Sequence, residues 1–182
     1  MSIRKLRRLL SGAILTGTAV ASTLAVTTGP AQAYGSLTVR FAVVDTGNCQ
    51  RVDGTLAVIA ESGGCRLNDS ADGTYFVKDP GGRAIKAEVR DGSGMVAKFE
   101  FHPSDERFWY YDTRNDGDTV YGQICGISVL PCSKLYAAPG TSNVIDYGIA
   151  DFDIVEDGRI DMNLYDDANG NEWISTILLG SS

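Results

Sequence analysis

The feature that most constrains this chain is an alternation of apolar and polar residues that recurs along nearly all of it. In "GRIDMNLYD", residues 158–166, Ile160, Met162 and Leu164 alternate with polar neighbours. Successive side chains of a β-strand point to opposite faces, so this pattern is typical of a strand with one buried face. No window carries a helical stripe of apolar residues over three turns. The pattern therefore predicts an all-β chain.

The alternating segments are bounded by turns rich in Gly, Asp, Asn and Pro, such as "DPGG" and "DGSG". A series of short strands at this spacing favours an antiparallel β-sandwich, with a small β-barrel as the alternative. Residues 133–144 fit no strand, and we expect a surface loop there. We expect about ten short strands, at residues 36–44, 54–61, 72–77, 83–91, 94–101, 107–113, 118–125, 148–155, 158–166 and 171–179.

The first 33 residues have the composition of a secretory signal peptide. Basic residues at the start precede an apolar stretch, and "AQA" at 31–33 offers the small residues that a signal peptidase requires. We expect cleavage after Ala33, which leaves a single domain at residues 34–182. The sequence thus predicts a secreted, extracellular protein with no membrane attachment once the signal peptide is removed.

The charge of the chain limits its partners. Residues 1–33 contain four of the 16 Lys and Arg residues and none of the 23 Asp and Glu residues, so their removal changes the net charge from −7 to −11. Such a surface repels phosphate backbones and anionic lipids, which argues against nucleic acid and membranes as partners. We expect a monomer with an unknown extracellular ligand, either a polysaccharide or a protein.

The four cysteines predict two disulfides, because cysteines of exported domains are usually oxidised. Of the three pairings that four cysteines allow, we favour Cys49–Cys65 and Cys125–Cys132, because each pair encloses a short segment rich in turn residues. Neither a CxxC spacing nor a neighbouring histidine supports a zinc site.

Two segments, 109–124 and 163–177, share a Tyr-Asp pair, a turn with Asn and Gly, and a second aromatic residue. The dipeptides Asp-Gly and Asn-Gly within them are strong signals for two-residue hairpin turns. We interpret the segments as one hairpin used twice. With two-residue turns, Asp112 would lie opposite Tyr121, and Asp166 opposite Trp173.

The stretch "YYDTRNDGDTVYGQIC" in the first segment resembles a hairpin of small secreted β-rich bacterial proteins that have no assigned activity. The resemblance covers this one hairpin. Because that group has no known function, the resemblance implies no activity and transfers no site residues.

Aromatic residues of the two segments are the candidate ligand-binding residues. Rings on an exposed sheet face can hold sugars by stacking, with polar neighbours around them. The alternative is that the rings belong to the core, since aromatic residues are favoured in strands anyway. The candidate rings are Trp109, Tyr111, Tyr121, Tyr165 and Trp173.

The acidic turns could also bind calcium through carboxylate and carbonyl oxygens. The same residues are equally explained by the turn conformations they favour, so we expect neither a metal nor another cofactor. If calcium bound, its candidate ligands would be Asp112, Asp116, Asp118, Asp166, Asp167 and Asn171.

Two other functions stay open beside a non-enzymatic binding or interaction module. A protease inhibitor could use the loop after Cys132, with Lys134, Leu135 or Tyr136 entering a protease pocket, because a loop braced by a disulfide loses little entropy on binding. The other alternative is a small hydrolase.

For a hydrolase, the only histidine is His102, with Ser104 and Asp105 close by, but residues so near in sequence seldom meet in the order that a triad needs. A glycosidase needs two carboxylates at a defined separation. Glu88, Glu100 and Asp161 lie in predicted strands, where we expect them on solvent-exposed faces. No catalytic constellation is recognisable, which favours the binding module.

Overall fold

The structure is a computed structural model that describes residues 34–126, 131–140, 144–154 and 158–181, so the predicted signal peptide lies outside it. The described part contains strands and one 3₁₀ turn, Pro103–Asp105, and no α-helix. The all-β prediction is therefore confirmed. The strands are β1 (Thr38–Asp45), β2 (Gln50–Gly54), β3 (Ile59–Glu61), β4 (Gly64–Leu67), β5 (Thr74–Val77), β6 (Arg83–Asp91), β7 (Gly94–His102), β8 (Arg107–Asp112), β9 (Tyr121–Gly126), β10 (Asp146–Asp151), β11 (Arg159–Tyr165) and β12 (Trp173–Ser181).

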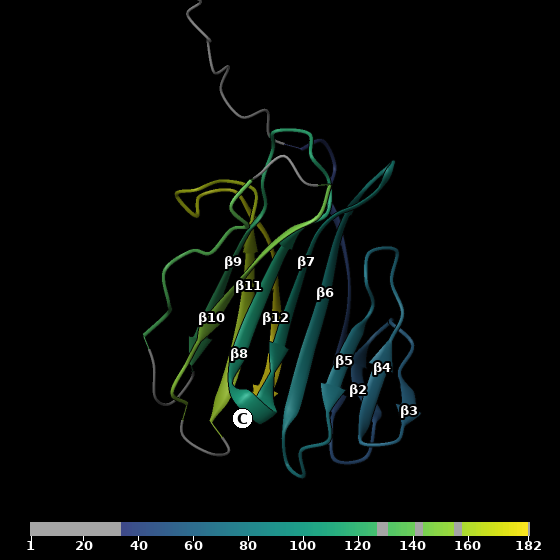
Figure 1. Ribbon diagram of the computed structural model, residues 1–182. Helices are drawn as coiled ribbons and strands as arrows, with labels where there is room; N and C mark the ends of the chain where they lie inside the picture. The colour runs from purple at the N-terminus through teal and green to yellow at the C-terminus, as the bar shows by residue number, and fades with distance from the viewer. Residues whose placement is uncertain (1–33, 127–130, 141–143, 155–157, 182) are drawn as a thin grey trace, which may run out of the picture.

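The strands form two large antiparallel layers (Figure 1). The six-stranded layer has the order β2-β1-β6-β7-β8-β10, and the three-stranded layer has the order β9-β11-β12. A single residue pair, Ser181 with Arg83, joins the two layers at one corner. The sheet does not close around a central axis, so the sandwich prediction is confirmed and the barrel alternative is wrong.

The main core lies between these two layers. The six-stranded layer contributes alternate residues such as Ile85, Phe99 and Phe108, and the three-stranded layer contributes Met162 and Leu164, all of them buried. In β11 these are the apolar positions of the period-two pattern, so the alternation of the sequence correctly predicts the buried face of that strand. Burial of this apolar surface is the main force that holds the layers together.

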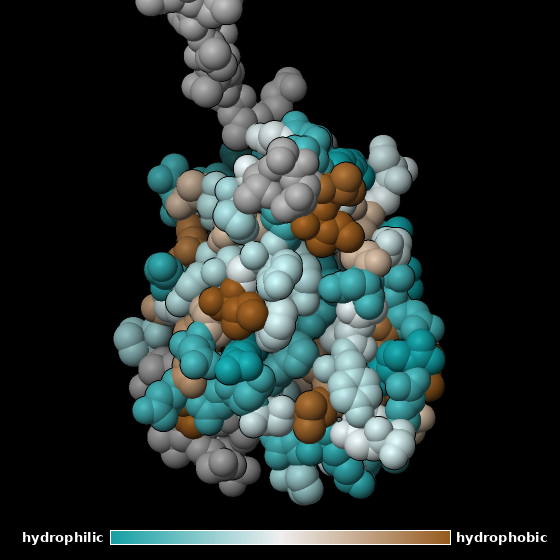
Figure 2. Space-filling model, in the orientation of Figure 1, coloured by the Kyte–Doolittle hydropathy of each residue, from teal (hydrophilic) through white to brown (hydrophobic). Residues whose placement is uncertain are grey.

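A small sheet of β3, β4 and β5 covers part of the outer face of the six-stranded layer, beside β1 and β6 (Figure 1). It encloses a second core that contains Val44, Leu67 and Phe76. Both predicted disulfides are confirmed: Cys49–Cys65 contributes to this second core, and Cys125–Cys132 lies at the end of β9. On the face shown in Figure 2, hydrophobic patches are small and separated by pale or hydrophilic surface.

The first predicted hairpin is wrong. Strand β8 pairs with β7 and β10, whereas β9 pairs with β11, so Asp112 lies opposite Asp146 and Ala97 and not opposite Tyr121. Residues 113–120 cross from one layer to the other. The Asp-Gly signal correctly marks a change of chain direction, with φ of 83° at Gly117, but the strands on its two sides belong to different layers.

The second predicted hairpin exists, with a longer turn. Strands β11 and β12 pair with Tyr165 opposite Trp173, one residue away from the predicted register. The carboxylate of Asp167 accepts hydrogen bonds from the backbone N–H groups of Asn171 (2.7 Å) and Glu172 (3.0 Å). A side chain that satisfies two backbone donors stabilises a loop wider than a two-residue turn.

Two smaller differences concern other segments. Residues 54–61 do not form one strand, because the chain turns at Gly54, which has a φ of 88°, and the segment is divided between β2 and β3. Part of the predicted loop 133–144 is hydrogen-bonded to β9. Tyr136 forms an antiparallel bridge with Gly122, and the two backbone N···O distances are both 2.8 Å.

Candidate functional site: the outer face of β9, β11 and β12

The alternation of the three-stranded layer presents a set of polar and aromatic side chains on its outer face. In β9, Gly122 and Ile124 face the core, so Tyr121 and Gln123 face outward, and the paired strands repeat this pattern. We call this surface the amide face. It consists of Tyr121, Gln123, Cys125, Asp161, Asn163, Tyr165, Trp173 and Thr176. Asp161, the third carboxylate expected on a solvent-exposed face, is half-buried here.

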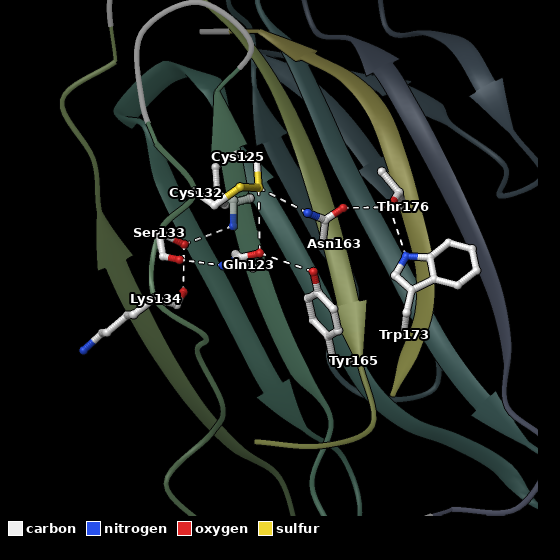
Figure 3. The surroundings of a disulfide bond; sticks show 10 residues. Gln123, Cys125, Cys132, Ser133, Lys134, Asn163, Tyr165, Trp173 and Thr176 are labelled. Atoms are coloured by element: carbon white, nitrogen blue, oxygen red, sulfur yellow. Dashed lines mark hydrogen bonds between the residues drawn. A yellow bond between two sulfur atoms is a disulfide. The ribbon is translucent and has the colours of Figure 1, made fainter. Parts of the chain in front are cut away.

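A chain of hydrogen bonds crosses the amide face (Figure 3). The indole Nε1 of Trp173 donates to Thr176 Oγ1 at 3.1 Å, and that hydroxyl donates to Asn163 Oδ1 at 2.7 Å. Asn163 Nδ2 in turn lies 3.1 Å from the sulfur of Cys125. The indole is 62 % exposed, yet its polar edge is held by Thr176 of the same strand, β12, and Thr176 is in turn bonded to Asn163 of β11.

The side-chain amide of Gln123 is held by two neighbours, Ser133 and Tyr165 (Figure 3). Its Nε2 donates to the backbone oxygen of Ser133 at 2.7 Å, and its Oε1 accepts from the hydroxyl of Tyr165 at 3.4 Å. The Ser133 hydroxyl accepts the backbone N–H of Ile124 at 3.1 Å. The Cys125–Cys132 disulfide connects the two segments that make these contacts, so the amide is oriented before any ligand arrives.

An acidic rim borders the amide face at the end where β9 begins and β11 ends. A hollow there is lined by Asp118, Tyr121, Asp166, Asp167 and Glu172, among others. Burial, together with the charges of Asp118, Glu172 and Asp167, raises the pKa of Asp166 to about 6.

The six candidate calcium ligands are only partly brought together. Asp118, Asp166 and Asp167 share the hollow, whereas Asp116 accepts from Tyr34 and Asp112 accepts the backbone N–H of Arg114. Within the ranges that the structure describes, no three His, Cys, Asp or Glu side chains converge closely enough to hold a metal ion. Asp167 and Asn171 instead stabilise their own turn, as the simpler interpretation predicts.

The other two candidate rings lie on the opposite outer face. Trp109 and Tyr111 project from β8 on the outer side of the six-stranded layer, with ring centroids 6.3 Å apart. Tyr147, opposite Tyr111 in β10, completes this cluster with a centroid distance of 5.8 Å to each of the two rings. Sequence reasoning missed Tyr147, although the alternation within its strand marks it as an outward residue.

Two of the three rings in this cluster are covered wholly or in part, whereas Tyr147 is 55 % exposed. Tyr111 is only 7 % exposed, and the ammonium of Lys98 lies 4.1 Å from its ring centroid. Trp109 packs against His102 and has a buried Nε1 with no hydrogen-bond partner among the described residues. The five candidate rings therefore separate into three on the amide face and two in a packed cluster on the other side.

The expectation that Glu88 and Glu100 face solvent is wrong. They do lie on the outer face of the six-stranded layer, but the small sheet and the loop at 68–73 cover this part of it, and both are at most 3 % exposed. Glu100 accepts from Thr74 at 2.5 Å and from Lys98 at 2.9 Å. His102 Nε2 lies 2.9 Å from the other oxygen of Glu100.

These contacts leave no triad around His102. Its nearest acidic partner is Glu100, and Ser104 is exposed in the 3₁₀ turn that follows β7. Burial acts to raise the pKa of Glu100, but the hydrogen bond with His102 and the charge of Lys98 outweigh it and hold the pKa below its usual range. Glu100 is thus a charged member of a structural network.

The three candidate inhibitor residues differ in their surroundings. Tyr136 packs against the main core, with its ring 5.3 Å from that of Tyr110 and 5.8 Å from that of Phe108. Leu135 is half-buried, and only Lys134 is exposed. The segment runs along β9 and makes backbone hydrogen bonds to Ile124 and Gly122.

No protein-family model matches the chain, and no curated protein or solved structure is significantly similar to it. Within the described ranges, no helix has the length and apolar character needed to cross a membrane. A function must therefore be argued from the geometry of the amide face itself.

Proposed function

We propose that the protein is a secreted, non-enzymatic binding protein that holds a neutral polysaccharide on the amide face. The observation that carries this proposal is the fixed and exposed indole of Trp173 beside oriented amide side chains. A sugar ring has an apolar C–H face and a rim of hydroxyls. It is therefore bound well by a flat ring with hydrogen-bonding groups around it.

The side chains around Trp173 retain hydrogen-bonding capacity. Asn163 uses one of its two N–H groups toward Cys125, and Gln123 uses one of its two toward Ser133. Each amide therefore keeps one donor for a ligand. Because the existing bonds already fix these side chains, little rotamer freedom would be lost on binding, which favours affinity.

The charge of the molecule supports a neutral ligand. The acidic rim beside Tyr121 and the net charge of −11 predicted for the processed chain both repel acidic polysaccharides.

Binding without turnover agrees with the position of the one histidine and its acidic partner. His102, the only histidine of the chain, lies in the six-stranded layer and not on the amide face. Its partner Glu100 is bound to Thr74 and Lys98, so this pair has no role in the proposed site.

Affinity electrophoresis in gels that contain hydroxyethyl cellulose, xylan or laminarin tests the proposal. The folded chain is expected to be retarded in at least one of these gels. Trp173→Ala should weaken the retardation about tenfold or more, because truncation of a central aromatic anchor typically costs at least about 1.4 kcal/mol. Its melting temperature should stay close to that of the parent, since the indole is largely exposed.

Tyr147→Ala is the matched control, because Tyr147 is 55 % exposed and lies on the opposite outer face. This variant should bind like the parent. The absence of retardation in all three gels, or an equal loss in Tyr147→Ala, would reject the amide face as a glycan site.

A further inference from the structure

Tyr34, the first residue after the predicted cleavage site, is held by three contacts. Its ring packs against the main core, and its hydroxyl donates to Asp116 Oδ1 at 3.1 Å. Its backbone N–H faces the carboxylate of Asp166, and the next residue, Gly35, lines one hollow together with that carboxylate. The nitrogen of residue 34 therefore has a defined place in the fold, at the acidic rim of the amide face.

The carboxylates at this place lack a cation. Asp118, Asp166 and Glu172 take part in none of the ion pairs of the described residues, and the nearby Arg114 pairs with Asp91 and Asp116. Asp166 Oδ1 is buried and has no hydrogen-bond partner in the described part of the chain. A buried carboxylate oxygen without a donor destabilises the folded state.

We propose that removal of the leader supplies the missing cation, because the new α-ammonium of Tyr34 pairs with Asp166. Hydrolysis by a peptidase breaks the Ala33–Tyr34 bond. Water gives its oxygen to the Ala33 carbonyl carbon, which becomes a carboxylate, and the Tyr34 nitrogen becomes an ammonium group. The inference rests on the predicted cleavage after Ala33 and is independent of the proposed glycan site.

The change of chemistry at the nitrogen explains why processing matters. A peptide nitrogen has one hydrogen and no charge, whereas an ammonium has three donors and a positive charge. The ammonium can donate a hydrogen bond to each of the two carboxylate oxygens of Asp166. Its positive charge also offsets the repulsion of Asp166 by the carboxylates of Asp118 and Glu172. A charged donor bound to a partly buried carboxylate is among the stronger polar contacts in proteins.

The docked amine would also border the amide face. A second hollow is lined by Gly35, Leu37, Asp166, Glu172 and Trp173. Both Asp166 and the residue that follows Tyr34 belong to its wall, so the processed terminus stands beside the indole that carries the proposed function. Leader removal thus both stabilises the domain and neutralises one side of this hollow.

The test uses the full chain, exported by a host that removes the leader, with the N-terminus identified by mass spectrometry. A glycine inserted between Ala33 and Tyr34 moves the amine away by one residue while leaving Tyr34 itself in place. At pH 7 the insertion should lower the melting temperature by about 2–4 °C, the shift that corresponds to a change of about 1 kcal/mol in a domain of this size. In the Asp166→Asn background the same insertion should have no effect.

A second measurement follows the amine directly. Acylation of the Tyr34 α-amine by an N-hydroxysuccinimide ester should be slowed about tenfold in the parent relative to Asp166→Asn, because a paired ammonium is a poor nucleophile. A processed terminus other than Tyr34 overturns the proposal. Equal melting temperatures with and without the insertion also overturn it, as does an equal loss in the Asp166→Asn background.

Discussion

Lys98 Nζ lies 2.9 Å from Glu100 Oε1, and both side chains are at most 3 % exposed. The same ammonium also donates to Asp72, to Asp69 and to the backbone oxygen of Gly73. A second buried lysine, Lys86, lies 2.6 Å from Asp69. Charges removed from water in this way depend on one another, because each alone would carry the cost of its own desolvation.

The first prediction concerns this network. Lys98→Met leaves Glu100 and Asp69 as buried carboxylates without their shared cation, and should lower the free energy of unfolding by about 3–5 kcal/mol. The control is Arg66→Met, which breaks the exposed pair with Glu61 and should cost less than about 1 kcal/mol. Urea denaturation measures both. Equal small losses in the two variants would show that the network is accessible to water.

The second prediction is a loss of stability in acid. The folded-state pKa of Glu100 is lowered, so its carboxylate stabilises the fold above the unfolded pKa, and this contribution is lost as the pH falls through the folded pKa. Asp69 acts in the same direction: burial alone would raise its pKa, but the hydrogen bond with Lys86 and further contacts hold it below its usual range.

The free energy of unfolding should therefore decrease as the pH falls below about 4, where unfolded Glu and Asp take up protons. Glu100→Gln removes one of the titrating groups, so its stability should depend less steeply on pH in this range. Urea midpoints between pH 2.5 and 5 provide the measurement. An unchanged acid slope in Glu100→Gln would assign the acid sensitivity to other carboxylates.

The third prediction concerns the contact between β9 and the main core. A Cβ atom at Gly122 would lie 2.6 Å from the ring of Phe99 and 2.7 Å from that of Phe108. Gly122→Ala should therefore destabilise the domain by about 1–3 kcal/mol through overpacking. Gly92→Ala is the control, because no atom lies within 4 Å of its added Cβ, and its effect should stay within about 0.5 kcal/mol. Thermal unfolding that fails to separate the two variants would contradict the close packing of β9 on these rings.

Local pattern was sufficient for the strands whose faces differ in polarity. The segment at 83–91 was predicted with the same bounds that β6 has, and the buried side of β11 follows from Ile160, Met162 and Leu164. The disulfides were also predictable, because each joins cysteines that are close in sequence across a turn. In all these cases the deciding information lies within a few neighbouring residues.

Long-range pairing was not predictable from the same information. The Asp-Gly sequence at Gly117 predicts that the chain changes direction there. It does not predict that β9 pairs with β11, some 40 residues later. Glu100 has the alternation of an outward residue, and only the position of the small sheet decides that it is buried. The amide face was predictable in part. The alternation shows that Tyr121 and Tyr165 lie on the outer face of their strands, but it does not predict the hydrogen bond from Gln123 to the backbone oxygen of Ser133.

The crossing at residues 113–120 also sets the order in which the protein can be built. A chain that emerges N-terminus first delivers β6, β7 and β8 early, with Phe99, Phe101 and Phe108 on a surface that β9, β11 and β12 cover later. The last of these strands is β12 (Trp173–Ser181), so the hydrophobic interior cannot be covered until β12 has been synthesised. Contacts between such distant parts of a chain form slowly, and exposed apolar strands are prone to aggregate in the meantime. The topology therefore leaves the apolar faces of β6, β7 and β8 uncovered until β12 is in place.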